Sequence, residues 1–234
     1  MSRDRLTCKR CGRCCISSSP TLHKKDLTLV KKRQIDTSFL YTIRKGEYVW
    51  DNIEQRLRKV PEEMIKVREK GEKGGCIFYD PVNRACTIYP YRPAQCVALF
   101  CQDNSEFFRL YRTPKLSRRD VLKDPSLLRL LEEQERRCSY EELEKWIRKI
   151  EAEGEKAVEK VIGLLRYDHK LRFLVVERLK LDPADLDFLL GRPMTETIRF
   201  YGLKVIEEDG IYLLTTIEAS THRGISLNAQ HSEK

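Results

Sequence analysis

Long apolar runs and the familiar catalytic motifs are both missing from this sequence. No window approaches the roughly 18 consecutive apolar residues of a membrane span, and no apolar stretch follows the N-terminus that could act as a signal peptide. The phosphate-binding patterns GxxxxGKS/T and GxGxxG are absent, as are HExxH and GxSxG. We therefore expect a cytoplasmic protein that makes no membrane contact, and whether it is an enzyme stays open.

Histidine is scarce, with four in 234 residues. His23 is the only one in the first hundred residues, and we expect it to face solvent and not to bind metal. The others, His169, His222 and His231, are scattered along the second half. A metal site in this chain therefore has to be built from other side chains.

Cysteine is plentiful by contrast, and it is clustered. Eight of the nine cysteines form two groups, Cys8, Cys11, Cys14 and Cys15, then Cys76, Cys86, Cys96 and Cys101. Two-residue gaps let one turn of backbone direct successive sulfurs at a single ion. In a reducing compartment clustered cysteines more often hold metal than form disulfides, although a disulfide framework is the rival interpretation. The two groups match the ligand demand of two four-coordinate centres, so the sequence predicts metal binding by all eight.

The adjacent pair Cys14-Cys15 indicates how such centres would form. Neighbouring side chains in extended backbone point in opposite directions, so we expect the two sulfurs to serve different centres, or one to stay free. Each centre then draws ligands from both groups, and metal staples residues 8–15 to residues 76–101. All-cysteine ligation suits both zinc and an iron–sulfur (4Fe-4S) cluster, and the lack of histidine favours iron–sulfur slightly. The ninth cysteine, Cys138, is predicted to be a buried small hydrophobe.

The formal net charge of +9 is concentrated near the N-terminus. Residues 1–75 carry 19 Lys and Arg against 10 Asp and Glu, and the rest of the chain is neutral. Eight metal-bound thiolates around two divalent ions would reduce the excess to about +5. We interpret this excess as a solvated basic face and do not expect nucleic acid as a partner, although a nucleic-acid site is the alternative.

The predicted fold is α+β and mainly helical. We expect a small metal-stapled cysteine domain with a short β-hairpin over residues 1–104, a helical region with a C-terminal hairpin over residues 105–222, and a flexible tail over residues 223–234. Within the first, the pattern predicts a short helix over 24–34, helical structure over 52–70 interrupted at Pro61, and a hairpin over 76–89. Pro93 is predicted to open a short helix that carries Cys96.

The predicted helical region contains two signals for the start of a helix. Asp124-Pro125 predicts a helix to about Arg137, and Ser139 to Glu142 reads as a capping box that opens a longer helix. The apolar stripe from Leu143 to Leu165 is typical of core or partner-helix packing, so a protein partner of this region is possible.

Signals near the C-terminus predict two further elements. Asp182-Pro183 opens a short helix that Gly191 closes. Residues 203–207 and 211–217 form a terminal hairpin.

Three segments carry a resemblance to a known family. These are Cys8-x-x-Cys11-x-x-Cys14-Cys15, then Gly75-Cys76-Ile77-Phe78, then Cys86-Thr87-Ile88-Tyr89 continuing through Arg92-Pro93 to Cys96. Their order resembles the CxxCxxCC cysteine-cluster family, a zinc- or iron-chelating domain also called the YkgJ family, over residues 8 to about 101. The resemblance implies metal chelation by Cys8, Cys11, Cys14, Cys15, Cys76, Cys86 and Cys96. Cys101 lies just past the core motif, so its assignment as a ligand depends only on the count of two groups of four cysteines.

Three functions compete on this basis. The first is a metal-chelating protein with a redox or an accessory, metal-handling role. The same domain type occurs in flagellin lysine N-methylases, so the resemblance also implies an iron–sulfur-assisted protein lysine N-methyltransferase that uses S-adenosylmethionine, and this second hypothesis requires a cleft beside the cluster. The third is a zinc-stabilised nucleic-acid binder that uses the basic first 75 residues.

Overall fold

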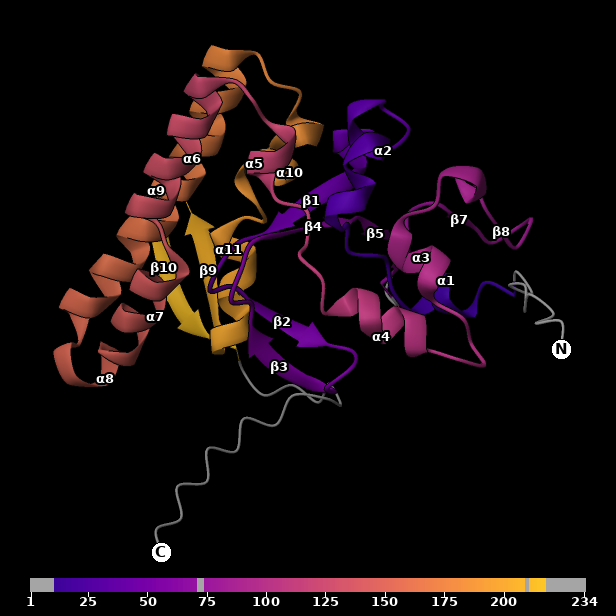
Figure 1. The fold of residues 1–234 in the computed structure, drawn as a ribbon. Coiled ribbons are helices and arrows are strands. Elements are labelled where there is room, and N and C mark those ends of the chain that lie inside the picture. Colours follow the sequence, from indigo (N-terminus) through magenta and orange to yellow (C-terminus); the bar gives the residue numbers. More distant parts are fainter. Residues whose placement is uncertain (1–10, 71–73, 209–210, 218–234) are drawn as a thin grey trace, which may run out of the picture.

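The computed structural model describes residues 11–70, 74–208 and 211–217 (Figure 1). Cys8 and the predicted tail over 223–234 lie outside these ranges. Short strands and helices from the first half of the chain pack beside a group of long helices from the second half. The predicted α+β, mainly helical class is confirmed.

The described residues up to 113 form short elements only. Their helices are α1 (Arg13–Ser17), η1 (Lys24–Asp26), α2 (Leu27–Lys31), η2 (Thr37–Phe39), η3 (Tyr89–Tyr91), α3 (Ala94–Ala98) and α4 (Ser105–Tyr111). Their strands are β1 (Leu40–Ile43), β2 (Tyr48–Asp51), β3 (Arg56–Lys59), β4 (Met64–Val67), β5 (Glu69–Lys70), β6 (Gly75–Cys76), β7 (Tyr79–Asp80) and β8 (Ala85–Cys86). Within the described residues they form two-stranded antiparallel pairs, β1–β4, β2–β3, β5–β6 and β7–β8.

The prediction of helical structure over 52–70 is wrong. This stretch contains β3, β4 and β5, and Pro61 lies in the connection between β3 and β4. The register pairs Leu40 with Val67 and Ile43 with Met64, so β4 is held by a strand more than 20 residues away. Long-range pairing places alternate residues of β4 in the core, and that gain outweighs a local spacing that also fits a helix.

Other predictions for this half are confirmed. A helical segment occupies 24–31, and β7 and β8 form the expected hairpin around Asp80, whose carboxylate accepts a hydrogen bond from Val82 N at 2.9 Å. The short helix after Pro93 is α3, which carries Cys96.

The rest of the chain is dominated by helices. They are α5 (Arg118–Val121), α6 (Pro125–Arg137), α7 (Tyr140–Arg148), α8 (Ile150–Glu153), α9 (Glu155–Leu179), η4 (Pro183–Asp185), α10 (Leu186–Leu190), α11 (Met194–Thr197) and η5 (Ile198–Tyr201). The terminal hairpin is β9 (Leu203–Glu208) with β10 (Ile211–Thr216), as predicted. No described helix has both the length and the apolarity needed to cross a bilayer.

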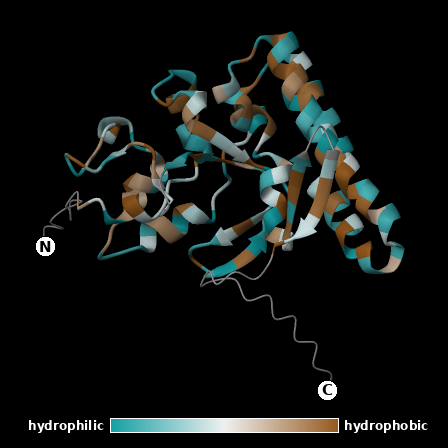
Figure 2. Cartoon of the chain, turned by 180° about the vertical axis from the view of Figure 1, so that it is seen from behind, coloured by the Kyte–Doolittle hydropathy of each residue, from teal (hydrophilic) through white to brown (hydrophobic). Residues whose placement is uncertain are grey.

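The predicted helix starts are correct, but one helix is divided. Asp124 accepts hydrogen bonds from Ser126 N and Leu127 N, and Ser139 accepts one from Glu142 N. The longer helix after Ser139 is broken at Gly154, whose φ of +55° suits glycine and reverses the chain. As a result α7 packs against α9, and the apolar stripe forms a core between two helices (Figure 2).

Buried ion pairs join the two parts of the chain. Arg118, only 1 % exposed, contacts Glu63 at 2.5 Å and Glu135 at 3.1 Å, and it donates to Leu189 O at 2.7 Å. Arg44 contacts the same Glu135 at 2.8 Å. Burial opposes ionisation of Glu135, but the charges of Arg44 and Arg118 outweigh it and lower the pKa of that carboxyl. The network fixes the short-element half against the helical half.

Candidate metal centre

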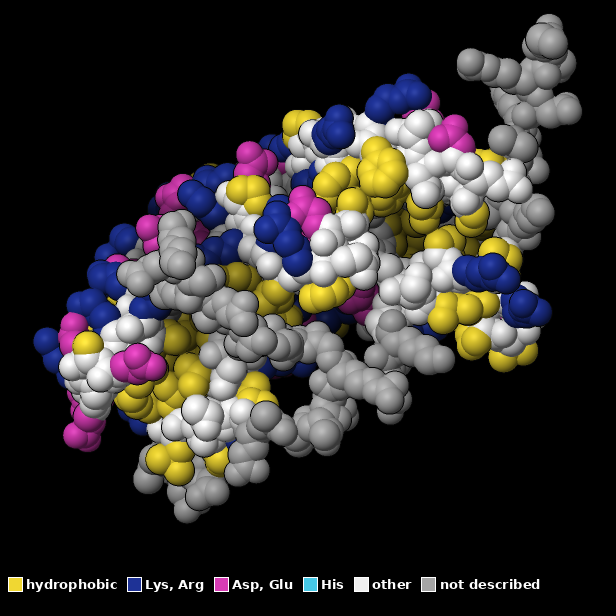
Figure 3. All heavy atoms as spheres, turned by 90° about the horizontal axis from the view of Figure 1, so that it is seen from below, with side chains coloured by type: hydrophobic (Ala, Val, Ile, Leu, Met, Phe, Trp, Pro, Cys, Tyr) yellow, Lys and Arg dark blue, Asp and Glu magenta, His cyan; other side chains and the backbone are white. Residues whose placement is uncertain are grey.

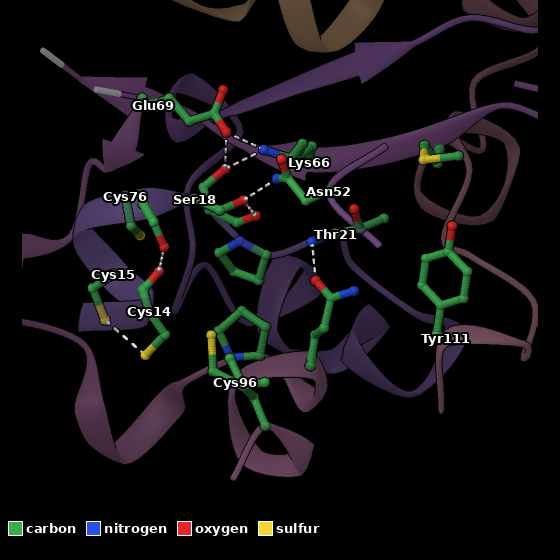
Figure 4. A pocket seen from close by; sticks show the side chains of 18 of the residues that line it. Cys14, Cys15, Ser18, Thr21, Asn52, Lys66, Glu69, Cys76, Cys96 and Tyr111 are labelled. Carbon is green, nitrogen blue, oxygen red and sulfur yellow. Dashed lines mark hydrogen bonds and ion pairs between the residues drawn. The ribbon is translucent and has the colours of Figure 1, made fainter. Parts of the chain in front are cut away.

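Five of the predicted ligands line one cleft. Cys14 and Cys15 come from α1, Cys76 from β6, Cys86 from β8 and Cys96 from α3. The cleft has a volume of about 860 Å³, and four of these cysteines are labelled in Figure 4. The structure therefore brings members of both cysteine groups to one place.

Two glycines permit the close approach of the segments involved. Gly12 has φ +76° at the start of α1, and a Cβ there would lie 2.5 Å from the Tyr79 hydroxyl on β7. A Cβ on Gly75 would lie 3.0 Å from Ile16 O and 3.2 Å from Cys15 O. Any larger residue at Gly75 would push β6, and with it Cys76, away from α1.

The adjacent cysteines do not diverge as expected. Cys14 and Cys15 lie in the helical turn of α1 and not in extended backbone, and their sulfurs are 3.9 Å apart. That separation is close to the edge of a zinc–sulfur tetrahedron, about 3.8 Å for Zn–S bonds of ~2.3 Å. The geometric reason for sending the two sulfurs to different centres is therefore removed.

The thiols influence one another electrostatically. A hydrogen bond with Cys15 lowers the pKa of Cys14 to about 6, and the same bond raises the pKa of Cys15. Burial raises the pKa of Cys96, and negative charge on Cys76 and Cys14 raises it further. Such a set of sulfurs ionises together only beside a cation, so its chemistry fits a metal or an iron–sulfur cluster.

Asp26 holds α3, and therefore Cys96, in place. Its buried carboxylate accepts hydrogen bonds from Ala94 N, at the first turn of α3, and from His23 N, both at 2.8 Å. Gln95 Oε1 accepts a bond from Thr21 N at 2.7 Å. These contacts join α3 to the segment that follows α1. Sequence reasoning missed Asp26, since its partner lies 68 residues away.

Three predicted ligands are not seen in the cleft. Cys11 and Cys101 are exposed and do not line it, and Cys8 lies outside the described residues. Among the residues that the structure does describe, no three His, Cys, Asp or Glu side chains already form a compact metal-binding group. The five sulfurs are gathered but are not drawn onto a single point.

Cys138 and His23 do not line the cleft. Cys138 is fully buried in the helical core, as predicted, and its thiol donates to Gln134 O at 3.2 Å. The prediction that His23 faces solvent is wrong, because it is 1 % exposed and its Nδ1 lies 2.9 Å from Thr113 Oγ1. Its position between η1 and the segment after α4 buries it, and burial with the nearby Lys115 lowers its pKa to about 4.

The cleft continues well beyond the cysteines. Its middle is walled by apolar side chains of one hydrophobic cluster, and these are Tyr41, Ile43, Val49, Val60 and Met64. At the far end Tyr111 donates a 2.7 Å hydrogen bond to Asp51, which also contacts Arg58 at 2.5 Å. The expectation of helical structure over 52–70 conceals the part of this wall that comes from Val60 and Met64. The aromatic and β-branched run Tyr48-Val49-Trp50 was the available strand signal.

Comparisons with known proteins agree with the cysteine pattern. Residues 7–113 match the family described as "CxxCxxCC: Putative zinc- or iron-chelating domain". No curated protein and no solved structure gives a significant match. The match spans every cysteine of the two groups and all five that line the cleft. Residues 7–113 of this chain therefore match the CxxCxxCC family, which is described as a zinc- or iron-chelating domain.

Proposed function

We propose that this protein carries an all-cysteine iron–sulfur centre and acts in the cytoplasm in a redox or accessory, metal-handling role. The ligands are drawn from Cys14, Cys15, Cys76, Cys86 and Cys96, with Cys8, Cys11 and Cys101 as further candidates. When bound, such a centre supplies one-electron transfer or an exposed iron site. The proposal keeps the division at residue 104 between the metal domain and the helical region.

The observation that carries this proposal is the opening of the sulfur group onto a cleft. Structural zinc sites are typically closed, with four ligands around an ion that contacts nothing else. Here five sulfurs, more than one tetrahedral ion needs, line the wall of a cleft of about 860 Å³. A centre in this position is accessible to a reactant, which favours a chemical role over a purely structural one.

The donor set also favours iron–sulfur over zinc. None of the residues that line the cleft is a histidine, and His23 is turned to Thr113. Burial raises the pKa of Cys96, and the positive charge of the nearby Arg92 lowers it. A nearby guanidinium offsets the negative charge that four thiolates give to an iron–sulfur cluster.

The deciding experiment is anaerobic purification of the full chain, followed by a visible spectrum and assays for iron, zinc and acid-labile sulfide. We expect a brown protein with iron and sulfide in equal amounts. Colourless protein with stoichiometric zinc and no sulfide would contradict the iron–sulfur proposal. Protein that is folded and free of all metal would contradict chelation as well.

Single replacements identify the ligands. Cys76→Ala and Cys96→Ala should abolish the visible absorption, whereas Cys138→Ala, which removes a buried thiol that does not line the cleft, should leave it unchanged. Cys11→Ala and Cys101→Ala decide whether the two exposed cysteines belong to the centre.

The methyltransferase is a second candidate because its required cleft is present beside the sulfurs. The lining carries seven Lys and Arg against three Asp and Glu, which is a poor match for the positively charged sulfonium of S-adenosylmethionine. Calorimetry with S-adenosylmethionine tests it, and absence of binding removes it.

The third candidate, nucleic-acid binding, depends on free basic residues in the first 75 positions. Several of them are instead engaged in ion pairs, namely Lys24, Arg44, Arg56, Arg58, Lys59, Lys66 and Arg68. A gel shift that weakens steeply with salt would support this candidate.

A further inference from the structure

We propose that the cleft beside the cysteine centre binds an organic anion of small-molecule size, with its acidic group at Arg112 and Lys115 and its apolar body directed toward the sulfurs. The proposal concerns the same cleft as the metal centre but does not depend on which metal is bound. Binding of such a ligand and the metal content are therefore separate results.

The size and walls of the cleft suit a small organic ligand. Small-molecule sites are usually concave spaces of about 300–1,000 Å³ with mostly apolar walls and a few polar groups. This cleft falls in that range, and the side chains of Ile43, Val49 and Met64 line its middle. Figure 3 shows hydrophobic side chains around a hollow in the surface, with Lys and Arg side chains on the neighbouring surface.

The two ends of the cleft differ in chemistry. Cys14, Cys15 and Cys76 lie on one side of the view in Figure 4 and Tyr111 on the other. Trp50 borders the cleft and is 46 % exposed. An elongated ligand would thus contact apolar surface along its length, with sulfurs at one end and polar groups at the other.

The side chains that line the cleft carry an excess of positive charge, which favours an anionic ligand. Three of its seven cations are matched, since Arg58 pairs with Asp51, Lys66 with Glu69 and Arg192 with Glu47. Four have no ion-pair partner within the described part of the chain, namely Arg84, Arg92, Arg112 and Lys115.

Two of these four are left for a ligand. Arg84 and Arg92 flank the cysteine-bearing β8 and α3, and the charge of Arg92 acts on the thiol of Cys96. Arg112 and Lys115 lie between α4 and α5, and the ammonium of Lys115 donates only to backbone, Tyr111 O and Thr113 O. The charge of Glu62 also acts on Lys115, but the two side chains form no ion pair. Burial and the charge of Arg58 lower the pKa of Lys115, and they outweigh the charge of Glu62, which raises it. An incoming carboxylate or phosphate would relieve that repulsion and accept charge-assisted hydrogen bonds.

A matched pair of fluorescent probes tests the proposal. 8-Anilinonaphthalene-1-sulfonate (ANS) and N-phenyl-1-naphthylamine (NPN) share an aromatic body, and only ANS carries the acidic group. Both are titrated into the full-length metal-loaded protein, and quenching of tryptophan emission is followed. The chain has two tryptophans, and the second, Trp146, packs in the helical core. A Trp146→Phe background therefore assigns the signal to Trp50.

We expect ANS to bind about tenfold more tightly than NPN, with a preference that declines as salt increases. The double variant Arg112→Gln/Lys115→Gln should lose that preference and still bind NPN, which shows that the cleft remains folded. Arg129→Gln/Lys170→Gln removes the same charge from exposed positions on α6 and α9, and it should behave as wild type.

Competition then separates the acidic groups. Displacement of ANS by octanoate indicates a carboxylate ligand, and displacement by octyl phosphate indicates a phosphate ligand. Equal affinity for ANS and NPN, an unchanged preference in the double variant, or displacement by neither competitor would overturn the proposal. Quenching that persists in Trp50→Phe would overturn it too, because the probe would then lie elsewhere.

Discussion

Gly75 governs how closely the two cysteine-bearing segments approach. Its missing Cβ leaves room for Ile16 O and Cys15 O, which are backbone atoms of α1 and yield little. We predict that Gly75→Ala displaces β6 by a few tenths of an ångström and speeds metal loss to a chelator severalfold. Gly163→Ala is the control, since nothing lies within 4 Å of its added Cβ in α9. It should stabilise the helix by up to about 1 kcal/mol without changing metal loss. Equal metal retention in both variants would refute the prediction.

His23 makes stability depend on pH. Its folded pKa of about 4 is below its ordinary value of 6.5, so above pH 6.5 both states hold the neutral ring. As the pH falls from 6.5 toward 4, the unfolded chain binds a proton that the native state does not, and native stability is lost. Between pH 7.5 and 5.0 this amounts to about 2 kcal/mol.

Urea unfolding of wild type and His23→Gln at those two pH values measures the difference. The variant should lose markedly less stability on acidification. His169→Gln, which alters an exposed histidine, should retain the wild-type pH dependence. Parallel pH dependence in wild type and His23→Gln would show that His23 does not contribute.

Residue identity indicated which side chains gather at this site better than it indicated how they are arranged. Clustered cysteines point to metal from spacing alone, and Cys138 was correctly separated from them because it lies outside both groups. The burial of His23 and the role of Asp26 depend on partners 90 and 68 residues away, Thr113 and Ala94. Local sequence carries no record of such contacts.

At the scale of elements, Asp26 connects η1 to α3. Its carboxylate holds two buried backbone N–H groups, one of them at the start of the helix that bears Cys96. Asp26→Ala should reduce the free energy of unfolding by roughly 2–4 kcal/mol, because both donors lose their acceptor. It should also speed metal release.

Asp124→Ala provides the comparison for that variant. It removes a helix cap at the start of α6, away from the cleft, and should cost about 1 kcal/mol with no effect on metal release. Urea midpoints and chelator kinetics measure both effects. Faster release in Asp124→Ala as well would attribute the effect to general stability and not to α3.

Element prediction succeeded where the signal is local. Asp124, Ser139 and Asp182 cap their helices as expected, because a cap acts within three residues. It failed for β3 and β4, whose partners are distant or whose turn was not recognised. The division at Gly154 was missed for a similar reason, since an apolar stripe continues across the break and only the packing of α7 on α9 shows it.

At the scale of the whole molecule, the buried network around Arg118 joins the short-element half to the helical half. Arg118→Met leaves Glu63 and Glu135 without this partner and should reduce the free energy of unfolding by roughly 3 kcal/mol or more. Arg119→Met removes the neighbouring exposed arginine, which pairs with Glu132, and should change stability by less than about 0.5 kcal/mol.

The two tryptophans report the two parts separately. Trp50 lies in the short-element half and Trp146 in the helical half, so Trp146→Phe and Trp50→Phe each isolate one signal. We expect coincident urea transitions in the wild-type background. Separate midpoints would show that the network does not make the halves unfold together.

The contact between Glu135 and Arg44 limits how the cysteine region can be transferred to another protein. The family match ends at residue 113, yet Arg44 inside it is fully buried and takes its carboxylate partner from α6, beyond that limit. A chain cut after 113 would lose this carboxylate together with Tyr140 and Gly191, which cover Arg44, and the surface that packs against them would become exposed to water. Recombination could therefore transplant the cysteine region into a new protein only together with its helices or with a replacement for the surface that they cover.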